Sequence, residues 1–260
     1  MKTMKKLTCY LTILTIFSSF ILLQQQRPTL YIIGDSTVRN GDGSGSNKQW
    51  GWGSFMAGHF DTSAITIRNH AIGGRSSRTF ITEGRWDTIL ARLKKGDYVI
   101  MQFGHNDGGP LDDTARARGT IRGIVEESKD IFNPKTNKQE TVYTYGWYMR
   151  KYIRDAKAKG ATPIVCSPIP RNSWKDGKVT RSSDSYGLWA KQVAEQEGAP
   201  FIDLNELVAK KYEEMGPDAV KPFFPADHTH TNIDGAKLNA QIVVDAIKTS
   251  DLSQLKHLLR

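Results

Sequence analysis

The chain has 260 residues, a mass of 29.1 kDa and a formal net charge of +9, from 36 Lys and Arg against 27 Asp and Glu. With 38% hydrophobic and 24% charged residues, the composition is that of a globular protein of about one domain and excludes a disordered chain. Two cysteines exclude a disulfide-stapled scaffold and a Cys-rich zinc module. The basic excess leaves nucleic acid, an anionic membrane and an acidic polymer as partner classes.

Residues 1–23 have the layout of a secretory signal. Lys2, Lys5 and Lys6 precede 17 uncharged residues that end at Leu23. Because 17 residues is at the lower limit for crossing a bilayer, cleavage is favoured over an uncleaved anchor. We therefore expect an exported protein, periplasmic or secreted, without a stable membrane partner. Cleavage removes three of the 36 basic residues and leaves 33 against 27, a net charge of +6.

From residue 28 the chain alternates apolar runs with amphipathic segments. Buried strands are expected at residues 29–33, 64–68, 98–103, 162–167 and 200–203. Helices are expected at residues 83–95, 145–159 and 233–248. This order predicts one domain over residues 28–250, a three-layer α/β/α sandwich around a five-stranded parallel sheet, whose functional site lies beyond the C-terminal strand ends.

Two further segments need an interpretation. Residues 108–144 are the longest stretch predicted to be irregular, with a turn at Asn133 and Pro134, and a segment of this size is typical of a binding loop or lid. Cys166, the one cysteine outside the signal, lies in an apolar run and is expected to be buried rather than nucleophilic.

Three candidate groups follow the first three strands directly. Ser36, in Gly34-Asp35-Ser36, stands where a strand-to-helix turn can expose its hydroxyl at the sheet edge. Gly74 and Asn106 follow the second and third strands, where a backbone N–H and a side-chain amide can donate to a developing oxyanion. Each alone is also ordinary turn chemistry.

The sequence Asp227-His228-Thr229-His230 precedes the last helix. A carboxylate three residues before a histidine can accept from its Nδ1 and leave Nε2 for a serine, so we expect His230 to be a base and Asp227 its partner. Asp234 is a rival partner. A metal site at Asp227, His228 and His230 lacks a fourth ligand at recognisable spacing. Together with Ser36, Gly74 and Asn106, these residues supply every role needed for acyl transfer through a serine.

The same blocks resemble the SGNH (GDSL-type) hydrolase superfamily and, more narrowly, the rhamnogalacturonan acetylesterase family, over about residues 29–249. The blocks that carry the resemblance are YIIGDSTV at 31–38, NHAIGGRSSR at 69–78, FGHND at 103–107 and DHTHT at 227–231. The family resemblance implies a flavodoxin-like sheet and release of acetate from acetylated pectin without a metal or organic cofactor.

Carried over to this chain, the resemblance implies that Ser36 is the nucleophile, His230 the base and Asp227 its partner. The oxyanion hole would consist of the Ser36 N–H, the Gly74 N–H and the Asn106 amide. Histidine instead of threonine before Asn106 departs from the general superfamily pattern but suits this subfamily.

The resemblance implies an acetylated acidic polysaccharide as the partner, and the basic excess of the chain would attract its galacturonate residues. Arg75 and Arg78 are expected to bind its carboxylates, and Arg116, Arg118 and Arg122 are further candidates. Nucleic acid is not expected, because no basic stripe or recognised binding module is present. Trp50 and Trp52 fit either sugar stacking or packing.

Several alternatives stay open. The alternative activities are those of an acetylesterase for another polysaccharide, such as xylan, and of a general short-chain esterase or lipase. A non-catalytic carbohydrate-binding protein on the same scaffold is the alternative of a different class.

Overall fold

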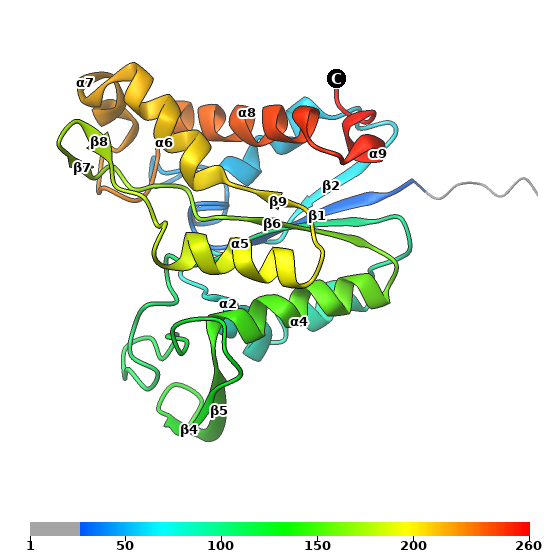
Figure 1. The fold of residues 1–260 in the computed structure, drawn as a ribbon, viewed down its shortest axis with the longest axis vertical. Helices are drawn as coiled ribbons and strands as arrows, with labels where there is room; N and C mark the ends of the chain where they lie inside the picture. The colour runs from blue at the N-terminus through cyan, green and yellow to red at the C-terminus, as the bar shows by residue number, and fades with distance from the viewer. Residues whose placement is uncertain (1–26) are drawn as a thin grey trace, which may run out of the picture.

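The computed structural model describes residues 27–260 (Figure 1). The predicted signal at residues 1–23 lies outside the described residues. Within the described part, no helix combines the length and the apolar character that crossing a membrane requires.

A five-stranded, fully parallel sheet forms the centre of the molecule, as predicted. In spatial order its strands are β2 (Thr66–Asn69), β1 (Thr29–Gly34), β3 (Tyr98–Gln102), β6 (Thr162–Cys166) and β9 (Phe201–Ile202). Because the strand order changes direction between β1 and β3, the loops after these two strands diverge at a switch point, where α/β sheets bind their ligands.

Each face of the sheet carries its own layer of helices (Figure 1). Leu30 and Ile32 of β1 pack in one hydrophobic cluster, whereas Tyr31 and Ile33 pack in the other, because successive strand side chains point to opposite faces. The first cluster joins the sheet to α6 (Leu204–Met215), α8 (Ile233–Thr249), α9 (Ser253–Lys256), η1 (Trp52–Ser54) and η2 (Met56–His59). The second joins it to α2 (Ser77–Thr82), α3 (Arg85–Leu90), α4 (Tyr145–Ala158) and α5 (Tyr186–Gln196). The three-layer α/β/α architecture is confirmed.

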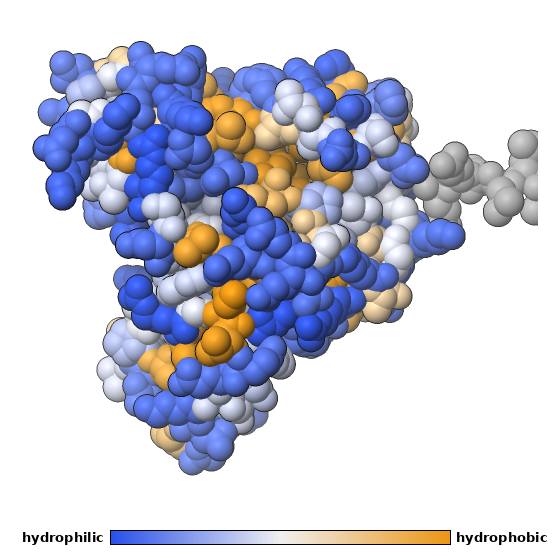
Figure 2. All heavy atoms as spheres, viewed as in Figure 1, coloured by the Kyte–Doolittle hydropathy of each residue, from blue (hydrophilic) through white to orange (hydrophobic). Residues whose placement is uncertain are grey.

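The prediction that residues 108–144 are irregular was wrong for the second half of the segment. It contains an antiparallel hairpin of β4 (Ser128–Asn133) and β5 (Lys138–Tyr143), which projects from the body of the molecule (Figure 1) and forms part of the lower lobe of its surface (Figure 2). Four of the six residues of β4 are exposed, so the hairpin lacks the apolar alternation by which a half-buried strand is recognised.

Other boundaries also differ from the prediction. The helix expected at residues 83–95 is shortened to α3, because Gly84 adopts a left-handed conformation (φ 70°) that separates it from α2. The core continues past residue 250, where Leu252 and Leu255 pack in the first cluster. Cys166 is fully buried, and burial raises the pKa of its thiol to about 12, in keeping with a packing role.

The remaining short elements lie around the C-terminal edge of the sheet. They are β7 (Trp174–Lys175), β8 (Lys178–Val179), α7 (Pro217–Val220) and η3 (Lys221–Phe223). In Figure 1 these elements lie above the C-terminal strand ends and the β4–β5 hairpin lies below them, so the edge is flanked on two sides.

Candidate active site

A continuous chain of hydrogen bonds links a serine, a histidine and an aspartate at the C-terminal edge of the sheet. The Ser36 Oγ lies 2.8 Å from the His230 Nε2, and the His230 Nδ1 lies 2.7 Å from the Asp227 Oδ2. Asp227 and His230 come from the loop before α8, whereas Ser36 is 194 positions away in the chain, directly after β1. In this arrangement an imidazole can remove the hydroxyl proton while a carboxylate stabilises the imidazolium that forms.

The Asp227 carboxylate is held in its ionised form by the loop itself. Its Oδ1 accepts hydrogen bonds from the backbone N–H groups of Thr229 and His230, at 2.7 and 2.8 Å. Partial burial works to raise the pKa of Asp227, but the bonds from the His230 ring and from these two N–H groups outweigh it and hold the pKa at about 2. No hydrogen bond or ion pair joins the rival Asp234 to His230 within residues 27–260; Asp234 is exposed in the first turn of α8.

Hydrogen bonds join the loop that carries His230 to the segment around Trp50 and to the start of α8. The Trp50 N–H donates to the Thr231 carbonyl at 2.8 Å, and the Asn232 side chain caps α8 by accepting from the Gly235 N–H. The backbone of Trp50 therefore helps to position the loop that carries His230. Trp52 is fully buried, and its indole donates to Gln102, so it serves packing.

The turn after β1 presents Ser36 because Asp35 fixes the residues around it. The Asp35 carboxylate is fully buried and accepts from the backbone N–H and the hydroxyl of Thr37, at 2.9 and 2.7 Å. A Cβ on Gly34 would lie 2.6 Å from the Gln102 carbonyl oxygen, so only glycine fits where the chain leaves the sheet. The serine hydroxyl thus stands on a rigid turn.

Three hydrogen-bond donors remain available beside this hydroxyl. Within the described chain, the backbone N–H groups of Ser36 and Gly74 have no hydrogen-bond partner. The Asn106 amide donates one hydrogen to the Arg75 carbonyl at 3.0 Å and retains a second. A Cβ on Gly73 would lie 3.4 Å from the Ser36 Cβ, which shows how closely the loop after β2 approaches the serine. Such an arrangement suits an anionic oxygen.

The loops after β2 and β3, which carry Gly74 and Asn106, are joined to each other by hydrogen bonds. The Asp107 Oδ1 accepts from the backbone N–H and the hydroxyl of Ser77, at 3.0 and 2.5 Å, so the loop after β3 is tied to the start of α2. Burial raises the pKa of Asp107 to about 7 despite these two bonds. From the other side, the Arg118 Nη1 donates to the Gly74 carbonyl at 3.1 Å.

Both arginines predicted to bind substrate carboxylates form ion pairs with glutamates of the protein itself. Arg78 is fully buried and forms a two-pronged ion pair with Glu140 of β5, at 2.7 and 2.8 Å, while its Nη1 donates to the carbonyls of Leu111 and Gly119. Arg75 donates to Glu83 and to the Gly73 carbonyl. Arg78 therefore holds the β4–β5 hairpin against the body of the protein, and its buried guanidinium is not accessible to a substrate.

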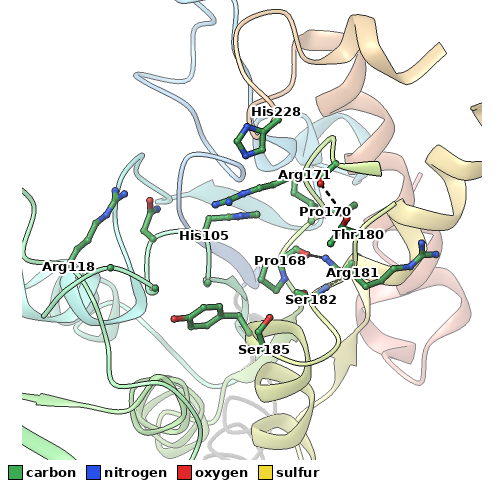
Figure 3. A pocket seen from close by; sticks show the side chains of 18 residues that line it. His105, Arg118, Pro168, Pro170, Arg171, Thr180, Arg181, Ser182, Ser185 and His228 are labelled. Atoms are coloured by element: carbon green, nitrogen blue, oxygen red, sulfur yellow. Dashed lines mark hydrogen bonds between the residues drawn. The ribbon is translucent and has the colours of Figure 1, made fainter. Parts of the chain in front are cut away.

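A cavity of about 550 Å³ opens beside Asn106 (Figure 3). Its wall is formed by the loop after β3, by Arg118, by residues 168–173 after β6 and by His228. The sequence analysis identified Asn106 and Arg118 but overlooked Arg171, which lies five residues after the end of β6 in a proline-rich segment. Among residues 27–260, no group of three or more His, Cys, Asp or Glu is arranged to hold a metal ion.

Comparison with known proteins identifies the family. Residues 32–238 match the model of the GDSL-like lipase/acylhydrolase family. The chain belongs to this family. It is therefore a carboxylic ester hydrolase, and the predicted resemblance is confirmed.

Curated relatives cover nearly the whole chain. A rhamnogalacturonan acetylesterase from Emericella nidulans is 33% identical over 226 residues, which are 86% of each chain. A probable rhamnogalacturonan acetylesterase, YesY, from Bacillus subtilis is 32% identical over 89% of this GDSL-like chain and 97% of its own.

Solved structures share the fold. The Bacillus subtilis protein YxiM superposes with a TM-score of 0.69 at 29% identity; the match covers 86% of this chain, which spans only 56% of that protein. An acetylxylan esterase from Geobacillus stearothermophilus, at 19% identity and a TM-score of 0.58, covers 86% of this chain and shows a likeness of fold alone.

Proposed function

We propose that this acylhydrolase is a serine acetylesterase that removes acetyl groups from acetylated rhamnogalacturonan, the pectin backbone. The observation that carries the proposal is the unbroken hydrogen-bond chain from Ser36 through His230 to Asp227, beside the free donors of Gly74 and Asn106. These groups correspond to nucleophile, base, orienting carboxylate and oxyanion donors.

The reaction takes place in two steps. The Ser36 Oγ attacks the acetyl carbonyl carbon while His230 takes the hydroxyl proton; the bond to the sugar oxygen then breaks, and His230 returns the proton to the leaving sugar alcohol. A water molecule attacks the acetyl-serine in the same way, releasing acetate and regenerating Ser36. Hydrogen bonds from Ser36 N–H, Gly74 N–H and Asn106 stabilise the oxyanion formed in each step.

Two observations support an acidic polysaccharide as the substrate. Curated relatives with about one third identity over most of the chain are named rhamnogalacturonan acetylesterases. The chain has a basic excess, +9 in full and +6 without residues 1–23, which attracts a polyuronide. The acetyl group itself is small and neutral, so selectivity must come from contacts with the sugar chain.

Acetate release from a small panel of substrates tests the proposal. We expect the wild-type enzyme to release acetate from acetylated rhamnogalacturonan faster than from acetylated xylan, and to lose this preference at high salt concentration. Ser36→Ala should lower kcat by at least about 10,000-fold on every substrate without changing the fold. As a matched control, Ser63→Ala removes an exposed hydroxyl just before β2, at the opposite edge of the sheet, and should leave kcat unchanged.

Activity of Ser36→Ala close to that of the wild type would contradict the serine mechanism. A higher rate on acetylated xylan, or on a short-chain ester alone, would contradict the substrate. Sugar binding without acetate release would favour a carbohydrate-binding protein.

We also propose that residues 1–23 direct export, because a basic start precedes an uncharged 17-residue stretch. Determining the N-terminal residue of the mature protein recovered outside the cytoplasm tests this. An intact N-terminus on a protein retained in the membrane would indicate an uncleaved anchor instead.

A further inference from the structure

The cavity beside Asn106 is electrostatically one-sided. No aspartate or glutamate belongs to its wall among the residues described, whereas three arginines do: Arg118, Arg171 and Arg181. A site walled by guanidinium groups without carboxylates attracts a negatively charged ligand.

The three arginines differ in how much of their hydrogen-bonding capacity is already used. Arg181 forms ion pairs with Glu206 and Glu213, and in Figure 3 its side chain points away from the cavity. Arg118 uses its Nη1 on the Gly74 carbonyl. Arg171 has no hydrogen bond from its guanidinium and no ion pair within residues 27–260. Among the three arginines of this wall, Arg171 is therefore the one whose guanidinium donors are all unused on the described chain.

Arg171 stands on a rigid part of the protein although it is exposed. Prolines at 168 and 170 restrict the backbone before it, and the Asn205 side chain holds the Pro168 carbonyl at 2.7 Å. The N–H of Asn172, the next residue, donates to the His228 carbonyl at 2.7 Å. The segment carrying Arg171 is thus joined to the loop that carries the candidate base.

Uncharged polar atoms complete the same wall. The His105 ring donates to the Ile169 carbonyl, and its Nε2 is buried without a partner. Burial lowers the pKa of His105; the charge of Asp35 acts in the opposite direction, and that of Arg171 lowers the pKa further. The Ser182 Oγ is also buried without a partner. In Figure 3, His105, Arg171 and His228 lie close together on one side of the cavity and Arg118 lies on the other.

We propose that this cavity binds a carboxylate-bearing residue of the acetylated sugar chain, and that Arg171 pairs with its carboxylate. The inference rests on the proposed function, because Asn106 belongs both to the cavity wall and to the oxyanion donors. A sugar chain whose acetyl group lies at Ser36 and Asn106 therefore extends into the cavity. Arg171 supplies the charge-assisted hydrogen bonds that a planar carboxylate takes from a guanidinium.

The test compares two forms of one substrate. Acetylated rhamnogalacturonan oligosaccharides are used as such and after methyl esterification of their carboxylates, and kcat and KM for acetate release are measured for the wild type and for Arg171→Gln. Arg92→Gln is the matched control, because it removes the same charge from an exposed arginine near the opposite edge of the sheet, before β3 begins. A chromogenic acetate ester reports whether each variant keeps an intact catalytic centre.

For Arg171→Gln we expect kcat/KM to fall about tenfold on the acidic oligosaccharide, mostly through KM, and to stay within about twofold on the methyl-esterified form and the chromogenic ester. Arg92→Gln should leave kcat/KM unchanged on both oligosaccharides and on the chromogenic ester. Equal losses on both oligosaccharides, or no loss on the acidic one, would overturn the role of Arg171 while leaving the esterase assignment intact. A wild-type enzyme that cleaves the chromogenic ester but neither oligosaccharide would overturn the proposed substrate and this inference together.

Discussion

The serine–histidine–aspartate chain and the cavity next to it differ in whether their polar groups are hydrogen-bonded within the protein. In the first region, the Ser36 hydroxyl, both nitrogens of the His230 ring and both oxygens of Asp227 are all hydrogen-bonded to one another or to their own loop. In the second, the Arg171 guanidinium and the Nε2 of His105 have no partner in the described chain.

Under the proposed function, the first region carries out the reaction and the second recognises the sugar chain. Groups that must keep one geometry in the transition state are fixed by the protein before any substrate arrives. Groups that bind a sugar chain are left unsatisfied until the ligand supplies their partners, so a poorly matching ligand leaves them unpaired. Variants of the first region should therefore lower activity on all ester substrates alike, whereas variants of the second should lower it only on acidic oligosaccharides.

The largest effect is expected from Asp227→Asn. An asparagine retains the shape but favours the wrong tautomer of His230, so kcat should fall by about 10,000-fold on acetylated oligosaccharides and on a chromogenic ester. Steady-state kinetics on both substrates measures it. Asp234→Asn, an exposed aspartate four residues after the histidine, is the matched control and should retain wild-type kcat. A large loss in that control would mean that Asp234 orients the base.

The pH dependence of wild-type activity also tests the contact between Asp227 and His230. Since the folded pKa of Asp227 is about 2, below the ordinary 3.8, its carboxylate is ionised at any higher pH and its contribution to stability is lost only as the pH falls from about 4 towards 2. Mild acid should therefore not break the contact between Asp227 and His230. An inflection in kcat between pH 3 and 5 that disappears in Asp227→Asn would contradict this.

An intermediate effect is expected at Asn106, which borders both regions. Removing its amide in Asn106→Ala should lower kcat about 100- to 1,000-fold with little change in KM, because we propose that the amide donates to the oxyanion in the transition state. The loss should be equal on acidic and methyl-esterified oligosaccharides. A change confined to KM on the acidic form would instead make Asn106 a sugar-binding residue.

The smallest catalytic effect is expected from Asp107→Asn, which acts on stability. The folded pKa of Asp107, about 7, is above its ordinary 3.8, so the folded state binds the extra proton and loses stability as the pH rises from about 4 to 7. The variant should abolish this loss, up to roughly 1 kcal/mol per pH unit, with kcat/KM changed less than about tenfold.

Urea unfolding between pH 4 and 8 measures this effect. Asp218→Asn, which replaces an exposed aspartate of α7, is the control and should keep the wild-type pH dependence. If Asp107→Asn unfolds with the same pH dependence as the wild type, the Asp107 carboxylate is not protonated at neutral pH in the folded protein.

The sequence predicted those features that depend on local pattern. Four of the five strands consist mostly of apolar residues, whereas β2 is half-buried and contains a single one, Ile67. The strands that lead to Ser36, Gly74 and Asn106 end close to these residues, so the sheet edge where they meet followed from the parallel strand direction. The spacing of three between Asp227 and His230 likewise suffices for the contact that the structure shows.

Features that depend on distant partners could not be predicted. Arg78 was expected at the substrate because nothing in its neighbourhood indicates that Glu140, 62 residues later, pairs with it. That partner belongs to the β4–β5 hairpin, whose polar strands gave no recognisable pattern. Arg171 was overlooked for the same reason, since only the tertiary contacts show that it faces the cavity unpaired.

The most direct test of the central claim is to identify the covalent intermediate. The enzyme is mixed with a chromogenic acetate ester, quenched in acid during turnover and digested, and the peptides are analysed by mass spectrometry. We predict one added acetyl group on the Ser36 hydroxyl in the wild type and none at that peptide in Ser36→Ala. An acetyl group on another residue that turns over at the rate of the reaction, or full activity of Ser36→Ala, would contradict the account.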